Sequence, residues 1–299
     1  MSAVSADVSI VGHPVHNQVH VEKRYRRLKV LLRRPTALAG GIGVVLIIAV
    51  AILAPLISPY NPTASNFSDL FSSPFSTGHL LGTDQLGRDT LSRLVYGARS
   101  TLEVGVLATI VGTIVAVPVG IISGYYRGFV DSIIMRITDV ILAFPFLVIA
   151  VGLAAIFGPS LQNAILALGI AQIPSVIRIS RGETLGLREQ EFIQAAIASG
   201  ASDFSVIFRY LLPNMMSPLV VQASIAIPGA ILGSALLSFL GVGVQPPTPA
   251  WGSMLATAQT YIYQDYWLAV LPGIAILVTT LSFNFFGDGL RDALDPSLS

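Results

Sequence analysis

Long uncharged runs dominate this sequence and restrict the folds that it can adopt. Residues 36–57 carry no charge over 22 residues, a length of about 33 Å as a helix at 1.5 Å per residue. Such a helix crosses the hydrocarbon core of a bilayer, which the shorter apolar region of a cleavable signal peptide would not. Hydrophobic residues make up 53% of the 299 positions and charged residues only 11%, against roughly 25% in an average soluble domain. We therefore predict an all-α integral membrane protein.

The remaining uncharged runs predict six transmembrane helices. The run at 140–177 would be about 57 Å long as one helix, and Gly158, Pro159 and Ser160 interrupt it, which predicts two spans joined by a tight turn. Glycines and prolines between 241 and 249 separate the last two spans. The spans are expected at 36–57, 104–126, the two halves of 140–177, about 217–240 and 266–287.

Basic residues predict how the chain is oriented in the cell membrane. Seven of the 17 Lys and Arg residues lie between 23 and 34, directly before the first span, and the positive-inside rule places them in the cytoplasm. With six spans, both termini are cytoplasmic and only Arg88, Arg93 and Arg99 lie outside. The predicted organisation is a cytoplasmic polar and basic tail at 1–35 and a transmembrane domain at 36–299, with an external loop at 58–99, a cytoplasmic loop at 183–216 and an external proline-rich loop at 241–265.

Two acidic residues in the first external loop precede arginines by four positions. The pairs are Asp84 with Arg88, and Asp89 with Arg93. This spacing predicts ion pairs on a solvated surface helix, which would partly offset the external cations.

Prolines and glycines inside the spans predict bent, closely packed helices. Gly120 with Gly124, and Gly229 with Gly233, have the four-residue spacing that lets membrane helices approach closely, which we interpret as packing. Prolines bend membrane helices without preventing them from spanning. The prolines in or near the second to sixth spans are Pro118, Pro145, Pro174, Pro228 and Pro272.

A short amphipathic segment between the fourth and fifth spans differs from the spans themselves. Phe192, Ala195, Ala196 and Ser199 fall at i, i+3, i+4 and i+7, which places them on one face of a short helix. Gly200 suits a left-handed cap at the end of this helix.

A second short helix is predicted directly after this glycine. Ser202 and Asp203 are good helix starters, and Pro213 is expected to stop the helix. The pattern by itself is typical of a helix pair that lies on the surface of a bilayer. The apolar positions of the second helix are Phe204, Ile207, Phe208 and Leu211.

Residues for energy conversion or catalysis are missing from the sequence. No Gly-Lys-Ser or Gly-Lys-Thr string occurs and no lysine follows Lys29, so the chain lacks a phosphate-binding P-loop. The predicted spans hold no mid-membrane charges that would couple transport to ions. Cysteine is absent and no histidine follows His79, so the spans lack a cysteine nucleophile and a histidine base for hydrolysis. We predict a passive pathway that is not an enzyme, has no cofactor or metal site and takes its energy from other subunits.

The segment 194–213 resembles the loop by which permease subunits of binding-protein-dependent ABC importers contact their ATPases. That loop reads Glu-Ala-Ala, three residues, Gly, nine residues, Ile, any residue, Leu-Pro. This sequence has Gln194 and Tyr210 where the family usually has Glu and Ile. The resemblance implies that the ATPase-docking residues are Gln194, Ala195, Ala196, Gly200, Asp203, Leu212 and Pro213.

Four further segments resemble the branch of this family that serves dipeptides, oligopeptides, nickel complexes and glutathione, and within it the second, C-type permease. They extend the resemblance from about residue 25 to the end of the chain. The segments are 81–99, 135–145, 237–252 and 286–296.

The resemblance implies an ABC type I importer permease fold with six transmembrane helices and a set of partners. These are a second homologous permease, two cytoplasmic ATP-binding subunits, an external solute-binding protein and membrane lipid, with no nucleic acid. Two alternatives remain open: a stand-alone carrier driven by an ion gradient, and a membrane scaffold without transport activity. The lack of mid-membrane charge argues against the carrier, and a scaffold gives the segment 194–213 no role.

Overall fold

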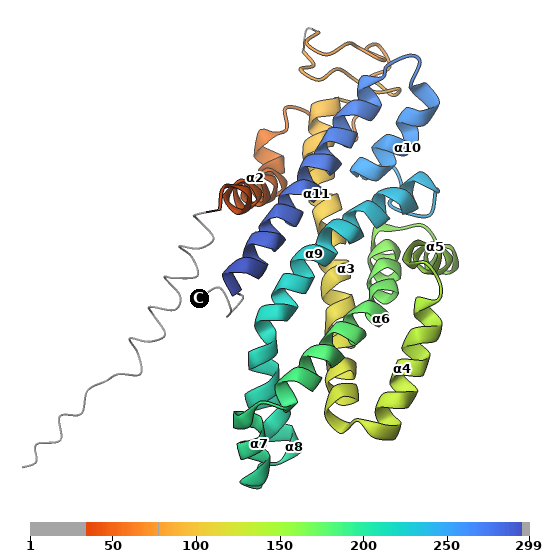
Figure 1. The fold of residues 1–299 in the computed structure, drawn as a ribbon. Coiled ribbons are helices and arrows are strands. Elements are labelled where there is room, and N and C mark those ends of the chain that lie inside the picture. Colours follow the sequence, from red (N-terminus) through yellow and green to blue (C-terminus); the bar gives the residue numbers. More distant parts are fainter. Residues whose placement is uncertain (1–33, 77, 295–299) are drawn as a thin grey trace, which may run out of the picture.

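The computed structural model describes residues 34–76 and 78–294, and the regular elements of this part are helices (Figure 1). Residues 1–33, most of the predicted polar tail, lie outside the described residues. The helices are α2 (Pro35–Ile57), α3 (Thr90–Tyr126), α4 (Gly128–Leu142), α5 (Phe146–Phe157), α6 (Leu161–Arg188), α7 (Glu191–Ala198), α8 (Asp203–Ser205), the π-helix η1 (Val206–Leu211), α9 (Leu212–Phe239), α10 (Trp251–Tyr261) and α11 (Trp267–Leu294).

Five described helices are long and apolar enough to cross a membrane, and the bent pair of α4 and α5 would make a sixth. The five are α2, α3, α6, the stretch from α8 through α9, and α11. Helix α10 and the loop before α3 lie at one end of the molecule, which we call the α10 end, whereas α7 and α8 lie at the opposite end, which we call the α7 end (Figure 1). The predicted all-α membrane architecture is confirmed.

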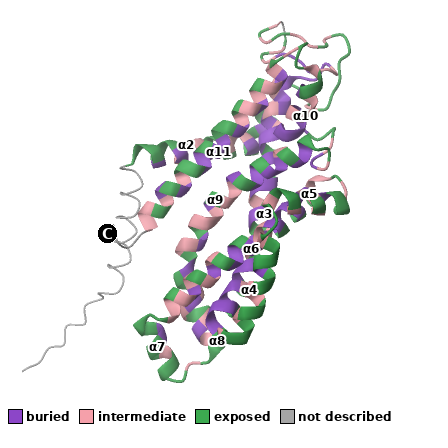
Figure 2. Cartoon of the chain, turned by 45° about the vertical axis from the view of Figure 1, so that its right-hand side comes forward, coloured by how far each residue is buried: buried purple, intermediate pink, exposed green. Residues whose placement is uncertain are grey.

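Helices α3 and α6 pack along each other in the middle of the bundle, where Figure 2 shows many of the buried residues. A Cβ added at Gly120 would meet the Ser180 Cβ at 2.5 Å, and one added at Gly124 would meet the Thr184 Cβ at 2.8 Å. Only glycine therefore permits this close approach, as the spacing predicts. In the second pair only Gly233 is closely packed, because a Cβ added there would meet Leu168 Cδ2 at 2.6 Å, whereas no atom lies within 4 Å of a Cβ added at Gly229.

The third predicted span begins earlier than expected and is broken at a proline. Helix α4 ends at Leu142 and α5 starts at Phe146, with an angle of 86° between them. Pro145 has no amide hydrogen and disfavours a helical conformation at the residue before it, so α4 cannot continue through it. The tight turn predicted at 158–160 is present between α5 and α6. The other four prolines lie inside α3, α6, α9 and α11.

Helices α3 and α9 both begin before their predicted spans. Helix α3 begins at Thr90, where the Asp89 carboxylate accepts the Ser92 amide at 2.7 Å and caps the first turn. With 37 residues it is about 55 Å long, so its first turns lie beyond the roughly 30 Å of a bilayer core. The prediction that Pro213 stops a helix is wrong. Pro213 occupies the first turn of α9, where a proline costs no intrahelical hydrogen bond.

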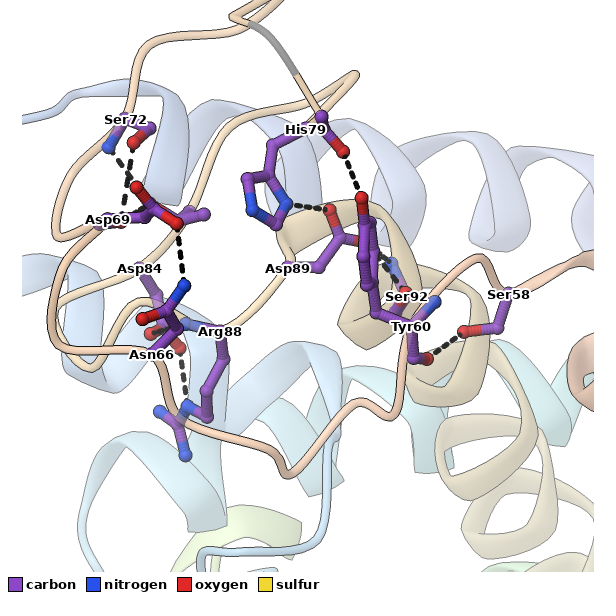
Figure 3. A network of polar contacts seen from close by, with 12 residues as sticks. Ser58, Tyr60, Asn66, Asp69, Ser72, His79, Asp84, Arg88, Asp89 and Ser92 are labelled. Atoms are coloured by element: carbon purple, nitrogen blue, oxygen red, sulfur yellow. Dashed lines mark hydrogen bonds and ion pairs between the residues drawn. The ribbon is translucent and has the colours of Figure 1, made fainter.

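The loop at the α10 end buries charged residues (Figure 3). Asp84 Oδ2 lies 2.7 Å from Arg88 Nε and 3.3 Å from Arg93 Nε, and each of these three residues is only 4–5% exposed. Asp89, also buried, pairs with His79 at 2.9 Å rather than with Arg93.

The predicted pair of Asp84 with Arg88 is confirmed, but the solvated helix and the pair of Asp89 with Arg93 are wrong. Asp84 and Arg88 lie in a turn before α3, and the loop folds back over the start of that helix, where Arg93 donates to the Pro62 carbonyl at 3.1 Å. Trp251 of α10 covers the same helix and donates its indole N–H to the Leu94 carbonyl at 2.8 Å. These contacts exclude water from charges that the sequence places in an external loop.

Helix α2 packs against α11, which brings the first and last described helices together. A Cβ added at Gly40 would lie 2.5 Å from the Phe286 amide nitrogen, so the two backbones nearly touch there. Arg34, directly before α2, forms an ion pair with Asp292 of α11.

Candidate functional site

The segment between α6 and α9 forms two short helices joined by an elbow at the α7 end (Figure 1). At the end of α7, the Gly200 amide donates to the Ile197 carbonyl at 3.0 Å and the Ala201 amide donates to the Ala196 carbonyl at 3.1 Å. This is a Schellman cap, which needs a left-handed residue at the elbow. Gly200 has φ = +82°, a conformation that it adopts without a Cβ clash. The predicted glycine elbow is confirmed.

The second short helix begins as predicted but does not keep one apolar face. Ser202 caps it by accepting the Ser205 amide at 3.4 Å. From Val206 the chain forms the π-helix η1, whose wider turns rotate later side chains relative to an α-helix. The predicted stripe is therefore split, because Phe204 is exposed whereas Leu211 is fully buried.

Buried side chains anchor the segment to the ends of α3 and α6. Tyr125 of α3 donates its hydroxyl to Asp203 Oδ1 at 2.8 Å, and the Arg188 guanidinium of α6 lies 5.4 Å from the Tyr125 ring centroid. The segment is thus held by apolar packing and by a polar contact to a helix 78 positions away in sequence. The residues packed around Tyr125 include Ile193, Val206 and Leu211, each fully buried.

Sequence analysis does not identify this anchor. Ile193 lies next to the predicted stripe in sequence but faces the opposite way, so the helical period alone could have suggested it. Tyr125 and Arg188 carry no such signal, because their roles depend on contacts across the fold.

The face of the segment that points away from the anchor is apolar and exposed. Phe204 and Phe208 are 71% and 54% exposed, and their ring centroids lie 4.4 Å apart. Ala195 of α7, before the elbow, is exposed as well, and Figure 2 shows much of α7 as exposed. Contiguous exposed apolar surface is a common feature of interaction sites.

The seven predicted docking residues take different places in this segment. Ala195 is exposed, Ala196 is half-buried and Gly200 forms the elbow. The side-chain amide of Gln194 donates to the Arg188 carbonyl at 2.8 Å, so it satisfies a carbonyl at the C-terminal end of α6. The other three are Asp203, which binds Tyr125, and Leu212 and Pro213, which form the first turn of α9.

Ion pairs join α4 to α6 close to this segment. Arg181 contacts both oxygens of Asp131 at 2.5 and 2.6 Å, and Arg178 contacts Asp139 at 2.5 Å. Among the described residues, no group of three or more His, Cys, Asp or Glu side chains is placed to hold a metal ion.

Comparison with known families decides the class of this protein. Residues 116–299 match the model of the binding-protein-dependent transport system inner membrane component. The chain belongs to this family. Residues 26–74 of the permease match the N-terminal TM domain of oligopeptide transport permease C, which assigns it to the C-type permeases of the oligopeptide branch. The permease is therefore a membrane subunit of a transport system and not an enzyme.

Curated relatives align with the permease over most of their length. The dipeptide transport system permease protein DppC of Escherichia coli is 46% identical over 272 residues, which cover 89% of this chain and 90% of the relative. DppC of Alkalihalophilus pseudofirmus is 43% identical and covers 90% and 88%. The glutathione transport system permease protein GsiD of Pectobacterium atrosepticum is 43% identical and covers 89% of both chains.

A solved structure confirms the fold at lower sequence identity. The permease is similar to a chain of the inward-facing MetNI methionine ABC transporter, with a TM-score of 0.58 and 21% identity. The match covers 69% of this chain and 97% of the other.

Proposed function

We propose that this permease forms half of the translocation pathway of an ATP-driven importer for peptides or a similar small solute. In this proposal α7, the Gly200 elbow and the start of the next helix dock onto a cytoplasmic ATPase. The observation that carries the proposal is the exposed pair of Phe204 and Phe208 directly after the Gly200 elbow, in a segment that is fixed to the transmembrane helices by a fully buried anchor.

The anchor gives the docking segment a mechanical role. Ile193 and Val206 are fully buried against Tyr125, so a displacement of α7 moves the end of α3. The hydrogen bond between Asp203 and Tyr125 adds a polar link to the same helix. An ATPase that changes shape beneath this segment therefore moves helices of the pathway, and the permease needs no nucleotide site of its own.

Family membership implies that the permease works with an ATPase and a binding protein. The number of each subunit is part of our proposal. The complex would contain a second homologous permease, two ATP-binding subunits and one external solute-binding protein. The relatives are named as transport proteins for dipeptides, di/tripeptides and glutathione. These names favour a short peptide as the transported solute.

The orientation proposed for the permease has both termini and α7 in the cytoplasm. The basic residues between 23 and 34 support it through the positive-inside rule. Because the chain has no cysteine, single cysteines report sidedness directly. We expect Ser73→Cys to react in intact cells with a membrane-impermeant thiol reagent and Ser202→Cys to react only after permeabilisation. Labelling of Ser202→Cys in intact cells would overturn the orientation.

Two substitutions in the docking segment test the function. Ala196→Asp would bury an unpaired charge against the ATPase, at a cost of several kcal/mol. Gly200→Val opposes the positive φ of the elbow, because a β-branched residue resists this conformation. We expect both variants to insert normally and to lose at least tenfold in ATPase co-purification and in ATP-dependent uptake, a factor that requires only about 1.4 kcal/mol.

The control for these variants is Ala198→Ser, an exposed α7 position at which a small polar side chain adds no charge. Normal ATPase binding by Ala196→Asp and Gly200→Val would leave the segment as a helix pair on the bilayer surface. Gradient-driven uptake by the isolated permease, without ATPase subunits, would instead establish a stand-alone carrier.

A further inference from the structure

An open cleft of ≈ 540 Å³ lies at the α10 end, apart from the docking segment. Its walls come from the first turns of α3, the turn between α5 and α6, and the proline-rich segment that follows α9. Val244 and Ala250 pack into the same buried cluster as Ala154 and Ala164, so the proline-rich segment is fixed against α5 and α6. The cleft has the size of a pocket for a small ligand, since such pockets occupy about 300–1,000 Å³.

The cleft contains one charge of each sign on the same helix. Arg99 and Glu103 both line it, and both are exposed. Neither side chain takes part in an ion pair within residues 34–76 and 78–294, whereas Arg88 and Arg93 nearby are paired with Asp84. The order of the two residues, with the cation four positions before the anion, is the less favourable one for a pair within a helix. The two charges thus remain available to a ligand.

The spacing of these charges favours a short zwitterion. Side chains four positions apart on a helix have Cβ atoms about 5–6 Å apart. The charged ends of an extended dipeptide lie at most about 7 Å apart, a separation that the ends of the long Arg99 and Glu103 side chains can bridge. A dipeptide would offer its carboxylate to the Arg99 guanidinium and its ammonium to the Glu103 carboxylate. A solute with one charge would leave one of the two side chains without a partner.

The location suits a site at the entrance of a pathway. Glu103 directly precedes the uncharged part of α3, which begins at Val104, so the cleft lies where the bilayer core begins. With the orientation proposed above, this is the external side, where a binding protein releases its solute.

We infer that Arg99 and Glu103 form an entry site that holds the carboxylate and the ammonium of a short peptide before it passes through the permease. This inference rests on the proposed function, because it names the site at which the proposed solute enters.

Cysteine protection in the complete transporter tests the site. Gln162→Cys and Thr248→Cys place thiols on exposed positions of two different walls of the cleft, and Ser73→Cys is an exposed control outside it. Transporter with its binding protein in proteoliposomes is treated with a membrane-impermeant thiol reagent, with and without the dipeptide alanyl-alanine. We expect the dipeptide to slow the modification of both cleft cysteines and not that of Ser73→Cys.

Modified dipeptides assign the two charges. N-acetylated alanyl-alanine lacks the ammonium and the C-terminal amide lacks the carboxylate, so each should protect about tenfold less well, which corresponds to about 1.4 kcal/mol. Glu103→Gln should abolish the preference for alanyl-alanine over the N-acetyl derivative and keep the preference over the amide, and Arg99→Gln should do the reverse. Asp69→Asn, an acidic residue of the same end that does not line the cleft, is the matched control.

The outcomes separate this inference from the proposed function. ATP-dependent uptake of alanyl-alanine without protection of the cleft cysteines would overturn the entry site and leave the function intact. Cysteines that react in the isolated permease but not in the assembled transporter, with or without peptide, would make the cleft a subunit interface. Absence of both ATPase binding and alanyl-alanine uptake would remove the proposed function and the entry site together.

Discussion

At the α10 end, Asp84, Arg88 and Arg93 are almost completely buried, whereas at the α7 end Phe204 and Phe208 are largely exposed. Both arrangements are unusual, since charged side chains are usually solvated and aromatic rings are usually buried. Arg88 and Arg93 both pair with Asp84 within the chain. The two exposed rings contact each other.

This difference separates structural residues from residues that await a partner. A buried charge cluster whose members pair within one chain presents little to another molecule, and removal of one partner leaves the others uncompensated. An apolar face that stays exposed on a rigid support gains its stabilisation only when another surface covers it.

Asp84→Ala is expected to destabilise the permease by about 3–5 kcal/mol, because it leaves Arg88 and Arg93 buried without their common carboxylate. The measurement is thermal unfolding of the purified permease in mild detergent, together with its level in the membrane. Asp69→Ala is the control, since the Asp69 side chain accepts an exposed hydrogen bond from Asn66, the substitution keeps the Asp69 carbonyl, and the change should cost well under 1 kcal/mol. Equal, small effects of the two substitutions would show that the buried cluster contributes little.

Phe204→Ser is expected to leave the stability of the isolated permease nearly unchanged and to weaken ATPase binding by about 2 kcal/mol, as for an aromatic residue at the centre of an interface. Phe67→Ser is a matched control, because Phe67 has the same exposed fraction of 71% but lies at the opposite end. Titration of the ATPase onto each variant gives the two affinities. If Phe67→Ser weakens binding as much as Phe204→Ser does, general surface hydrophobicity is responsible and the docking face is not specific.

Gly200→Ala is expected to destabilise the docking segment by about 1 kcal/mol, because an L-residue is strained at φ = +82° even though the space around it is open. Gly186→Ala provides the opposite case, an open position inside α6 where alanine should stabilise the helix by about 0.5–1 kcal/mol. Hydrogen exchange of the amides in α7 measures the local effect. Faster exchange is expected for Gly200→Ala alone.

Gln194→Glu is expected to have the smallest effect. The change removes the donor that binds the Arg188 carbonyl at 2.8 Å, but this hydrogen bond is exposed and contributes about 0.5–1 kcal/mol. The variant restores the residue that the family usually has at this position, so uptake and ATPase binding should stay within about twofold of the parent. A loss of uptake as large as that of Ala196→Asp would show that the Gln194 contact itself is essential for coupling.

The sequence predicts well where a single local rule decides the structure. The uncharged runs predict the membrane class, Gly200 predicts the elbow, and Gly120 with Gly124 predict the close packing of α3 against α6. Each of these rests on a property of the residue itself: apolar length, freedom at positive φ, or the absence of a Cβ.

Prediction fails where two local rules compete or where a distant segment intervenes. Pro213 satisfies both the rule that proline ends a helix and the rule that proline begins one, and the fold uses the second. The spacing of Asp89 and Arg93 permits a pair, but His79 takes Asp89 because the loop folds back over α3.

From the amino-acid sequence alone we predict an α-helical membrane protein that resembles a permease and has a glycine elbow between its fourth and fifth spans. Which charges are buried, which apolar residues anchor the elbow and which remain exposed depend on the folded chain. Local propensities act within a few residues, whereas burial depends on which distant segment covers a side chain. Tyr125 and Asp203 illustrate this limit, since 78 positions separate two residues that are joined by a hydrogen bond.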